Sequence, residues 1–340
     1  MKAAVFHGPG SPLTVEEVAA PSAGPGEMVL KVKHCGVCGT DLHYTEEGTS
    51  VAVGAVIGHE FCGEVVEIGE GVADHWKVGD RAVSMPFVGC GKCVQCLGGT
   101  PIWCRSMRSH ASGQMSGGFA QFTAVGAAGS VKLPTSVSWD EAALVEPLAV
   151  GLHGVRRARL DAGANVLVVG AGPVGLAVVI WAKALGARRI VVTARSNRGA
   201  NMALALGATD FIEGDKDVRR EFRRLTGAQP DAVFECVGAP GILEQCLSYA
   251  PIGGQVVVIG GCMKPDLITP AVGINKELTV TFALAYDVSD YAVTVDRLAR
   301  GQVDPTIMIT DRVDFAAFPA AFEALRNRTH QCKVLLSPDA

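Results

Sequence analysis

The sequence has no excess of positive charge. Its 30 lysine and arginine residues are outnumbered by 34 aspartate and glutamate residues, which gives a formal net charge of −4. Proteins that bind nucleic acid carry a basic patch or stripe, so nucleic acid is not an expected partner. We also expect no secretory signal, because residues 1–6 start a strand-like run with no apolar segment of useful length. We therefore expect a cytoplasmic protein, and eleven cysteines, an odd number, agree with a reducing compartment.

The sequence also lacks a membrane-spanning run. Residues 166–182 carry no charge, but a glycine-rich turn at residues 170–175 divides them and Lys183 ends them. A bilayer needs about 20 consecutive apolar residues, so we expect a buried strand and helix here and no membrane partner. Repeats and low-complexity linkers are absent too. A length of 340 residues with 49% hydrophobic residues indicates two domains with separate cores.

Four cysteines within fifteen residues form the most informative pattern of the chain: Cys90, Cys93, Cys96 and Cys104. Gaps of two residues allow neighbouring thiolates to bind one cation, and the longer gap lets the fourth sulfur complete a tetrahedron. The iron–sulfur pattern differs, because its last gap has three residues and a proline follows. We predict a closed structural zinc site in a lobe at residues 88–105. The alternatives are two disulfides or scattered buried thiols.

Three other segments offer ligands for a second, open metal site. They contain Cys38, the pair His59 and Glu60, and Glu146. A catalytic zinc keeps three protein ligands and leaves one position for substrate. Any one of these residues alone is more often structural, and only their combination favours a metal.

At these residues the chain resembles a known family. The pattern G-H-E-x2-G-x5-G-x2-V at residues 58–72 resembles the zinc signature of medium-chain alcohol dehydrogenases, and the cysteine run is similar to that family's structural-zinc lobe. The segments around Cys38 and Glu146 are similar to its sorbitol and threonine dehydrogenase branches. The resemblance implies an α/β fold, with a doubly wound parallel Rossmann sheet at residues 151–289. It also implies a mainly β, GroES-like catalytic domain built from residues 1–150 and 290–340.

The resemblance also implies roles at the open site. Cys38, His59 and Glu146 would hold a zinc ion that binds the alcohol oxygen and lowers its pKa. Glu60 is a candidate for a transient ligand or a neighbour of the ligands. With the four cysteines, the expected content is two zinc ions per subunit.

Three residues near Cys38 have implied roles in handling the ligand and the proton. Asp41 would orient the His59 ring by a hydrogen bond, as carboxylates commonly do for metal-bound histidines. Thr40 would carry the alcohol proton outward, and His43 would relay it to solvent. The alternatives are turn-forming roles for Thr40 and Asp41 and a surface position for His43.

The glycine pattern at Gly170, Gly172 and Gly175 follows an apolar strand and opens a helix, which is the context that a dinucleotide site requires. Strands at 165–169, 189–193, 231–235 and 255–259 alternate with helices at 174–186 and 199–206, and this alternation predicts a doubly wound parallel sheet. The expected cofactor-binding residues are Gly170, Gly172, Pro173, Val174, Gly175, Ala194, Arg195, Ser196, Arg198, Val237 and Ile259.

The end of the second of these strands favours NADP(H) over NAD(H). An NAD site usually places Asp or Glu there to bind the ribose hydroxyls, about 20 residues past the glycines. This chain has Ala194 instead, followed by Arg195, Ser196 and Arg198. Arginine binds a 2′-phosphate through paired hydrogen bonds. The alternative is a solvated basic loop that leaves NAD acceptable.

The expected substrate is a small alcohol and its carbonyl product. Polyol-oxidising relatives tend to have Arg-Tyr where this chain has Ala285 and Tyr286. Loss of the guanidinium, with Tyr44 and Phe282 as further pocket residues, favours a fairly apolar secondary alcohol. The alternatives are an NAD-dependent polyol or sorbitol-type dehydrogenase, or a zinc-bearing dinucleotide-binding protein without turnover.

An apolar segment at residues 278–284 reads as the last strand of the dinucleotide domain and carries no charge. An exposed edge of this kind invites pairing with another chain. In the resembled family this edge joins two subunits, so we expect a homodimer or a homotetramer. The alternative is an edge covered by the chain's own loops.

Overall fold

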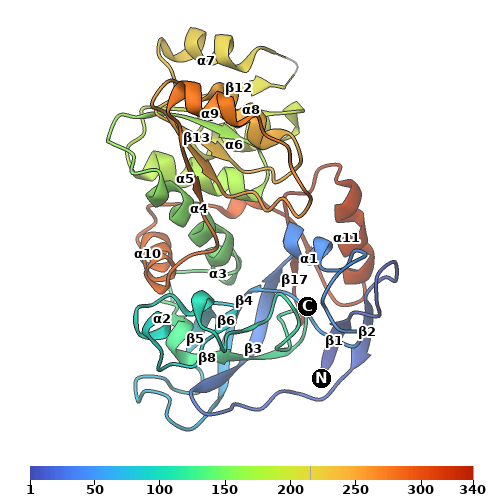
Figure 1. The fold of residues 1–340 in the computed structure, drawn as a ribbon. Helices are drawn as coiled ribbons and strands as arrows, with labels where there is room; N and C mark the ends of the chain where they lie inside the picture. Colours follow the sequence, from blue (N-terminus) through green and yellow to red (C-terminus); the bar gives the residue numbers. More distant parts are fainter. Residues whose placement is uncertain (215, 340) are drawn as a thin grey trace. The chain divides into compact units, whose positions relative to one another are not determined.

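The computed structural model describes residues 1–214 and 216–339. The chain divides into two units (Figure 1). The first consists of Met1–Glu146, Asp287–Gly301 and Ile309–Ala340, and the second of Pro147–Tyr286 and Gln302–Met308. The sequence did not predict that residues 302–308 belong with the second unit.

The second unit contains a six-stranded parallel sheet in the order β12-β11-β10-β13-β14-β15. From β10 the chain first builds outward to β11 and β12, and then returns to add β13, β14 and β15 on the other side. The order therefore reverses between β10 and β13, which is the switch point where doubly wound sheets bind dinucleotides. The strands are β10 (Asn165–Val169), β11 (Arg189–Ala194), β12 (Asp210–Glu213), β13 (Ala232–Glu235), β14 (Gln255–Val258) and β15 (Thr279–Phe282).

The five strands predicted for this unit are confirmed, β15 among them. The central residues of β10, β11, β13 and β14 are buried on both faces because helices cover the sheet (Figure 1). The edge strand β12 was not predicted. Its sequence, Asp-Phe-Ile-Glu, has a charge at each end, and only Ile212 is fully buried, so the apolar signal is short. The helices are α4 (Val145–Arg157, which begins in the first unit), α5 (Pro173–Ala184), α6 (Ala200–Leu206), α7 (Val218–Thr226), α8 (Ile242–Tyr249) and α9 (Pro270–Lys276).

The first unit is built around a mainly antiparallel sheet. Its strand order is β16-β17-β3-β4-β5-β9, and β8 also pairs with β3. The long strands β3 (Glu27–Gly36) and β4 (Glu60–Ile68) run through its centre. The other strands are β1 (Lys2–Val5), β2 (Thr14–Glu17), β5 (Arg81–Ser84), β6 (Phe87–Val88), β7 (Arg108–Ser109), β8 (Phe122–Gly126), β9 (Ser130–Lys132), β16 (Ile309–Val313) and β17 (Lys333–Leu336).

The C-terminal part of the chain completes this first unit. Strand β17 pairs antiparallel with the end of β3, so the last strand lies next to the segment that leads to Cys38. The core packs Phe119 against Phe318 and Phe322, with the centres of the first two rings 4.8 Å apart. The helices are α1 (Gly39–His43), α2 (Val94–Leu97), α3 (Trp139–Ala143), α10 (Val288–Ala299) and α11 (Phe318–Ala324).

Local signals explain where several helices begin. Ser138 caps α3 by accepting a hydrogen bond from the Glu141 N–H, while the Glu141 carboxylate accepts from the Ser138 N–H, as the sequence predicts. Pro173 occupies the first turn of α5. Backbone N–H groups in that turn have no partner within the helix, so the N–H that proline lacks costs no hydrogen bond. No helix within residues 1–214 and 216–339 has the length and apolar character to cross a membrane.

Candidate functional site

The four cysteines of the lobe gather in one place. The Sγ atoms of Cys90, Cys93, Cys96 and Cys104 all lie within 4.8 Å of one another. A tetrahedral zinc ion with Zn–S distances of about 2.3 Å requires sulfurs about 3.8 Å apart, so this cluster fits the ion. All eleven cysteines are free thiols in the structure, and none of the four in the lobe is in a disulfide.

Hydrogen-bond donors and burial shift the pKa values of these thiols in opposite directions. Backbone N–H groups of Lys92 and Cys93 lower the pKa of Cys90 to about 6, and the N–H of Cys96 lowers the pKa of Cys93. Burial instead raises the pKa of Cys96 to about 12. Binding a cation to all four sulfurs therefore releases protons, including the one held by Cys96.

A second cluster joins Cys38, His59 and Glu60. One ligand atom from each lies within 4.8 Å of the others. Cys38 precedes the first turn of α1, and His59 and Glu60 lie at the start of β4. A thiolate, an imidazole nitrogen and a carboxylate oxygen form a donor set that zinc accepts, so these residues fit a metal. His59 and Glu60 are 6% and 1% exposed, and Cys38 is half-buried.

Asp41 fixes the orientation of His59. Its Oδ1 atom lies 2.9 Å from His59 Nδ1, and its Oδ2 accepts a hydrogen bond from the Cys38 N–H at 2.8 Å. Nδ1 is thus occupied, and Nε2 is the nitrogen left for a metal. Burial by itself lowers the pKa of His59, but the Asp41 carboxylate outweighs it and holds that pKa well above its usual value. A metal at Nε2 must therefore displace a proton.

The sequence reading missed Lys333, which lies beside this cluster. Its Nζ donates to both carboxylate oxygens of Glu60, each at 2.6 Å, and to the Val37 carbonyl oxygen at 3.0 Å. Both side chains of this ion pair are 1% exposed. Burial disfavours the charged lysine, yet the charge of Glu60 keeps the pKa of Lys333 above its ordinary value. Only pairing across the sheet, 273 residues apart in the chain, brings the two together.

Glu146 lies near this cluster without joining its close set of atoms. It is buried in the first turn of α4, and its negative charge helps to raise the pKa of Lys333. Among the described residues, the carboxylate whose oxygen groups within 4.8 Å of both Cys38 Sγ and a His59 ring nitrogen belongs to Glu60. The assignment of Glu146 as a zinc ligand remains a prediction.

The residues expected to move the proton lie on α1. Thr40 Oγ1 is 3.6 Å from Cys38 Sγ, and its side chain is exposed. His43, three residues further on the same helix, is also exposed and lies 3.5 Å from a carboxylate oxygen of Glu46. Tyr44 ends the helix and is half-buried against the core.

The glycine-rich turn closes tightly after β10. Gly170 has a φ of +113°, which side chains other than glycine rarely adopt, and a Cβ added to Gly175 would lie 2.0 Å from the Gly170 carbonyl oxygen. Both positions therefore require glycine. Pro173, Val174 and Gly175 then form the first turn of α5, whose N–H groups suit a phosphate.

Glu235 holds the neighbouring loop at the switch point, and sequence reasoning did not identify it. This carboxylate is 3% exposed, and its Oε1 accepts hydrogen bonds from the Val237 and Gly238 N–H groups at 2.7 and 2.9 Å. A Cβ at Gly170 would lie 2.9 Å from Val237 Cγ2. The position of Glu235 at the end of a buried strand is the sequence signal that was available. Ile259, after β14, donates its N–H to the Glu235 carbonyl oxygen.

The residues expected to select the cofactor follow β11. Ala194 is half-buried, whereas Arg195, Ser196 and Arg198 are exposed. This loop lies against the glycine-rich turn, because a Cβ at Gly199 would be 2.7 Å from the Ala171 side chain. In the sheet register, Ala194 lies opposite Glu213 of β12.

Two of the expected pocket residues lie in the second unit. Phe282, in β15, is 71% exposed, and Tyr286 is 1% exposed. The residue before Tyr286, Ala285, has a φ of +50°, which is uncommon for a residue with a side chain.

Comparison with known families gives matches to both parts of the chain. The alcohol dehydrogenase GroES-like domain matches residues 24–135. The zinc-binding dehydrogenase family matches residues 173–300.

Curated relatives match over the whole length. Sorbitol dehydrogenase of Bacillus subtilis (strain 168) is 32% identical, with 100% of this chain and 98% of the relative covered. The (R,R)-butanediol dehydrogenase of the same organism is also 32% identical, with 100% of both chains covered.

Solved structures with the same fold hold either cofactor. An alcohol dehydrogenase from Escherichia coli CFT073, complexed with NADH, has a TM-score of 0.90, an identity of 28% and 99% coverage of both chains. A zinc-binding dehydrogenase from Sinorhizobium meliloti 1021, bound to NADP, has a TM-score of 0.88, an identity of 30% and 99% coverage of both chains.

The buried Glu60–Lys333 pair generates a stability prediction. Replacing Lys333 by Met leaves the Glu60 carboxylate buried without its cation, so the free energy of unfolding should fall by about 3–5 kcal/mol. Urea denaturation followed by circular dichroism measures the change. Combining Lys333→Met with Glu60→Gln should restore part of it, because the buried charge is then removed.

Lys31→Met serves as the matched control for this experiment. Lys31 pairs with Asp339 at 2.9 Å, but its side chain is 37% exposed. Exposed ion pairs contribute about 0–1 kcal/mol, so this variant should change little. Equal losses for Lys31→Met and Lys333→Met would contradict the prediction.

Proposed function

Because this chain belongs to the zinc-dependent medium-chain alcohol dehydrogenase family, in its sorbitol-type branch, we propose that it interconverts a fairly apolar secondary alcohol and its ketone, with NADP(H) as the preferred cofactor. The family establishes a zinc-dependent alcohol dehydrogenase that uses NAD(P) and a small alcohol substrate. The choice of alcohol, of NADP and of two zinc ions per chain is our proposal.

The observation that carries the proposed chemistry is the arrangement of Cys38, His59 and Asp41. A zinc ion bound there supplies Lewis acidity, which lowers the pKa of an alcohol oxygen. A nicotinamide cofactor held at the glycine-rich turn and the start of α5 would supply the acceptor for the hydride of the alcohol carbon. Asp41 holds the His59 ring through Nδ1 and the Cys38 backbone through its N–H, so one carboxylate positions two proposed ligands.

The alcohol proton leaves through α1 in this proposal. The Thr40 hydroxyl lies next to Cys38 Sγ, where it can accept the proton and pass its own onward. His43 follows three residues later, on the same side of the helix, and its exposed ring hands the proton to solvent. One hydride and one proton thus leave each alcohol molecule, which balances its oxidation to a ketone.

Lys333 keeps Glu60 in place in this proposal. With both of its carboxylate oxygens bound to Nζ, Glu60 remains beside the proposed ligands without taking the position that substrate needs. Glu146 is then the proposed third ligand, because it is the other buried carboxylate close enough to affect Lys333.

The proposal of an apolar alcohol rests on Ala285. A polyhydroxylated substrate is best bound by hydrogen-bonding and charged groups, and an alanine side chain offers neither. The butanediol dehydrogenase relative acts, by its name, on a short secondary alcohol, whereas the sorbitol dehydrogenase relative acts on a polyol.

We expect a higher kcat/KM with an aliphatic ketone than with the ketose fructose. The oxidation of NADPH, followed at 340 nm, measures both rates.

Purified protein should contain two zinc ions per chain. Cys38→Ser should abolish turnover with little change in melting temperature. Cys96→Ser should instead lower the melting temperature, because one lost ligand opens a closed site.

Higher kcat/KM with fructose would favour the sorbitol-type alternative. Active, folded protein with one zinc ion per chain would contradict the two-site assignment. Tight cofactor binding without turnover of any carbonyl or alcohol in the panel would favour a binding protein.

The cofactor preference can be tested by exchanging the residues after β11. Ala194→Asp combined with Arg195→Asn should move the ratio of kcat/KM values from NADP towards NAD. Charged hydrogen bonds to the 2′-phosphate contribute about 2–3 kcal/mol, so the ratio should change about 30- to 150-fold. Arg220→Asn, at an exposed arginine of α7, serves as the control and should leave the ratio unchanged.

One observation favours NAD as the second candidate. Glu213 lies opposite Ala194 in the register and brings a carboxylate to the end of the neighbouring strand. If Glu213 bound the ribose hydroxyls, wild-type protein would have the higher kcat/KM with NAD, and Glu213→Gln would lower it. That pair of results would overturn the NADP proposal.

We further propose that β15 pairs with β15 of a second copy. It has one neighbour, β14, and Val280, Phe282 and Leu284 are exposed along and after it. The opposite edge strand, β12, carries Asp210 and Glu213, and such charges discourage pairing.

Thr281→Lys should weaken this dimer, because it places a charge in the pairing edge. Multi-angle light scattering across a dilution series should then give a lower mass than for wild-type protein. Glu213→Lys adds a lysine to the other edge and should leave the mass unchanged. A stable, active wild-type monomer in dilute solution would end the proposal.

A further inference from the structure

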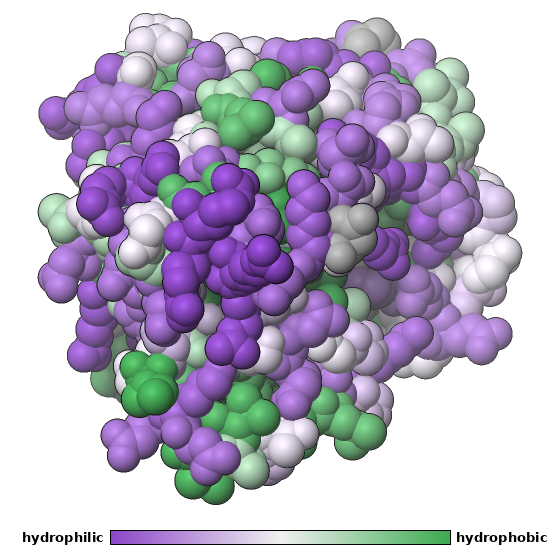
Figure 2. Space-filling model, turned by 90° about the horizontal axis from the view of Figure 1, so that it is seen from above, coloured by the Kyte–Doolittle hydropathy of each residue, from purple (hydrophilic) through white to green (hydrophobic). Residues whose placement is uncertain are grey.

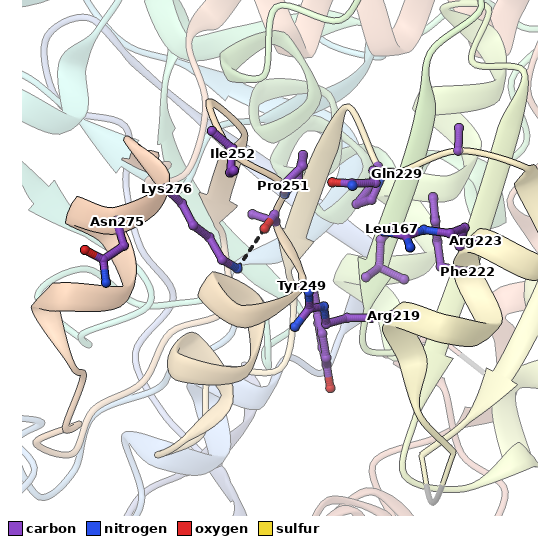
Figure 3. A pocket seen from close by; sticks show the side chains of 13 residues that line it. Leu167, Arg219, Phe222, Arg223, Gln229, Tyr249, Pro251, Ile252, Asn275 and Lys276 are labelled. Atoms are coloured by element: carbon purple, nitrogen blue, oxygen red, sulfur yellow. Dashed lines mark hydrogen bonds between the residues drawn. The ribbon is translucent and has the colours of Figure 1, made fainter.

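A basic pocket lies in the second unit at the edge of the sheet opposite the glycine-rich turn (Figure 3). Its volume is about 280 Å³. Gln229 and Pro230 precede β13, and Pro251 and Ile252 precede β14, so the pocket lies where the parallel strands begin. The glycine-rich turn follows the end of β10, and the pocket is therefore separate from the cofactor site. The lining residues are Leu167, Arg219, Phe222, Arg223, Ala228, Gln229, Pro230, Tyr249, Ala250, Pro251, Ile252, Asn275 and Lys276.

The charges of this pocket are all positive. Arg219 and Arg223 come from one side of α7, one turn apart, and Lys276 comes from the end of α9 (Figure 3). No lining residue is acidic. Within residues 1–214 and 216–339, neither Arg219 nor Arg223 forms an ion pair. Figure 2 shows that hydrophilic side chains dominate the face seen from above, the side on which Figure 1 draws α7.

Lys276 contributes charge without contributing free donors. Its Nζ donates to the carbonyl oxygens of Leu247, Ser248 and Ala250 at 2.7–2.9 Å, which occupies all three N–H groups. Burial, and then the charge of Arg219, lower the pKa of Lys276. Positive groups thus approach each other here with no counter-ion in the lining, and an anion between them would relieve that repulsion.

The remaining surface of the pocket defines the rest of the ligand. Phe222 and Leu167 are buried at its apolar side, and the Tyr249 ring and Pro251 offer further flat surface. Two arginines one helical turn apart suit the three oxygens and double charge of a phosphate group better than a single carboxylate. The volume lies near the lower end for small-molecule sites, so the organic part is no larger than one ring.

We propose that this pocket binds a small organic phosphate, with Arg219 and Arg223 on the phosphate and the apolar side against a ring-sized body. The site goes beyond the proposed dehydrogenase reaction, because its residues lie at the opposite edge of the sheet from the nucleotide-binding loops. Binding there does not require turnover.

Isothermal titration of the zinc-loaded protein, saturated with NADP, tests the proposal, because the filled cofactor site cannot take up the probe. Phenyl phosphate is the probe, and inorganic phosphate and benzoate are the comparisons at constant ionic strength. Phenyl phosphate should bind more tightly than either. Arg219→Gln with Arg223→Gln should weaken its binding at least tenfold.

Arg220→Gln with Arg224→Gln is the matched control, since it removes the same charge from the same helix outside the pocket lining. Its affinity for phenyl phosphate should stay within threefold of wild type. Equal losses in the two double variants would show general electrostatic attraction and overturn the proposal. Tighter binding of benzoate or equal binding of inorganic phosphate would overturn the ligand class. No binding of phenyl phosphate to wild-type protein would overturn the site.

Discussion

The buried ion pair between Glu60 and Lys333 ties the candidate metal site to the end of the chain. Glu60 starts β4 and Lys333 starts β17, and both strands pair with β3. A buried charge without a partner is strongly unfavourable, so neither strand can move away from the other at little cost. Gly36 of β3 makes room for the pair, since a Cβ there would lie 2.2 Å from a Glu60 carboxylate oxygen. The position of His59, next in sequence to Glu60, depends on this constraint.

The two candidate metal sites differ in what their surroundings allow. The four sulfurs of the lobe complete a coordination shell by themselves, which leaves no place for a substrate. At Cys38 and His59 the chain supplies fewer close donors. Asp41 orients the His59 ring there, and Lys333 holds the Glu60 carboxylate. In our proposal the first arrangement stabilises a loop, whereas the second keeps a position open for chemistry.

The direction of the strands in the parallel sheet separates the two sites that we propose for the second unit. All strands end on the side of the glycine-rich turn, where Glu235 and the helix start of α5 order the loops for a nucleotide. All strands begin on the other side, where Arg219 and Lys276 surround the basic pocket.

The sequence by itself determined the elements whose information is local. The four cysteines, the glycine-rich turn, the Ser138 cap and the apolar strands of the parallel sheet follow from spacing and from runs of a few residues, and the family follows from the motif at residues 58–72. These features need only neighbouring residues, so their signals are present before the chain folds.

Only the tertiary structure decided which distant residues meet. Lys333 is an unremarkable lysine before a strand until β17 pairs with β3 and places it on Glu60. Glu235 and the arginines of α7 are likewise ordinary charges in the sequence, and strand β12 was too short and too charged to predict. Lys333 and its partner Glu60 lie 273 residues apart, and the basic pocket joins α7 to the end of α9, so this charge pair and this pocket exist only once the sheets have fixed the register.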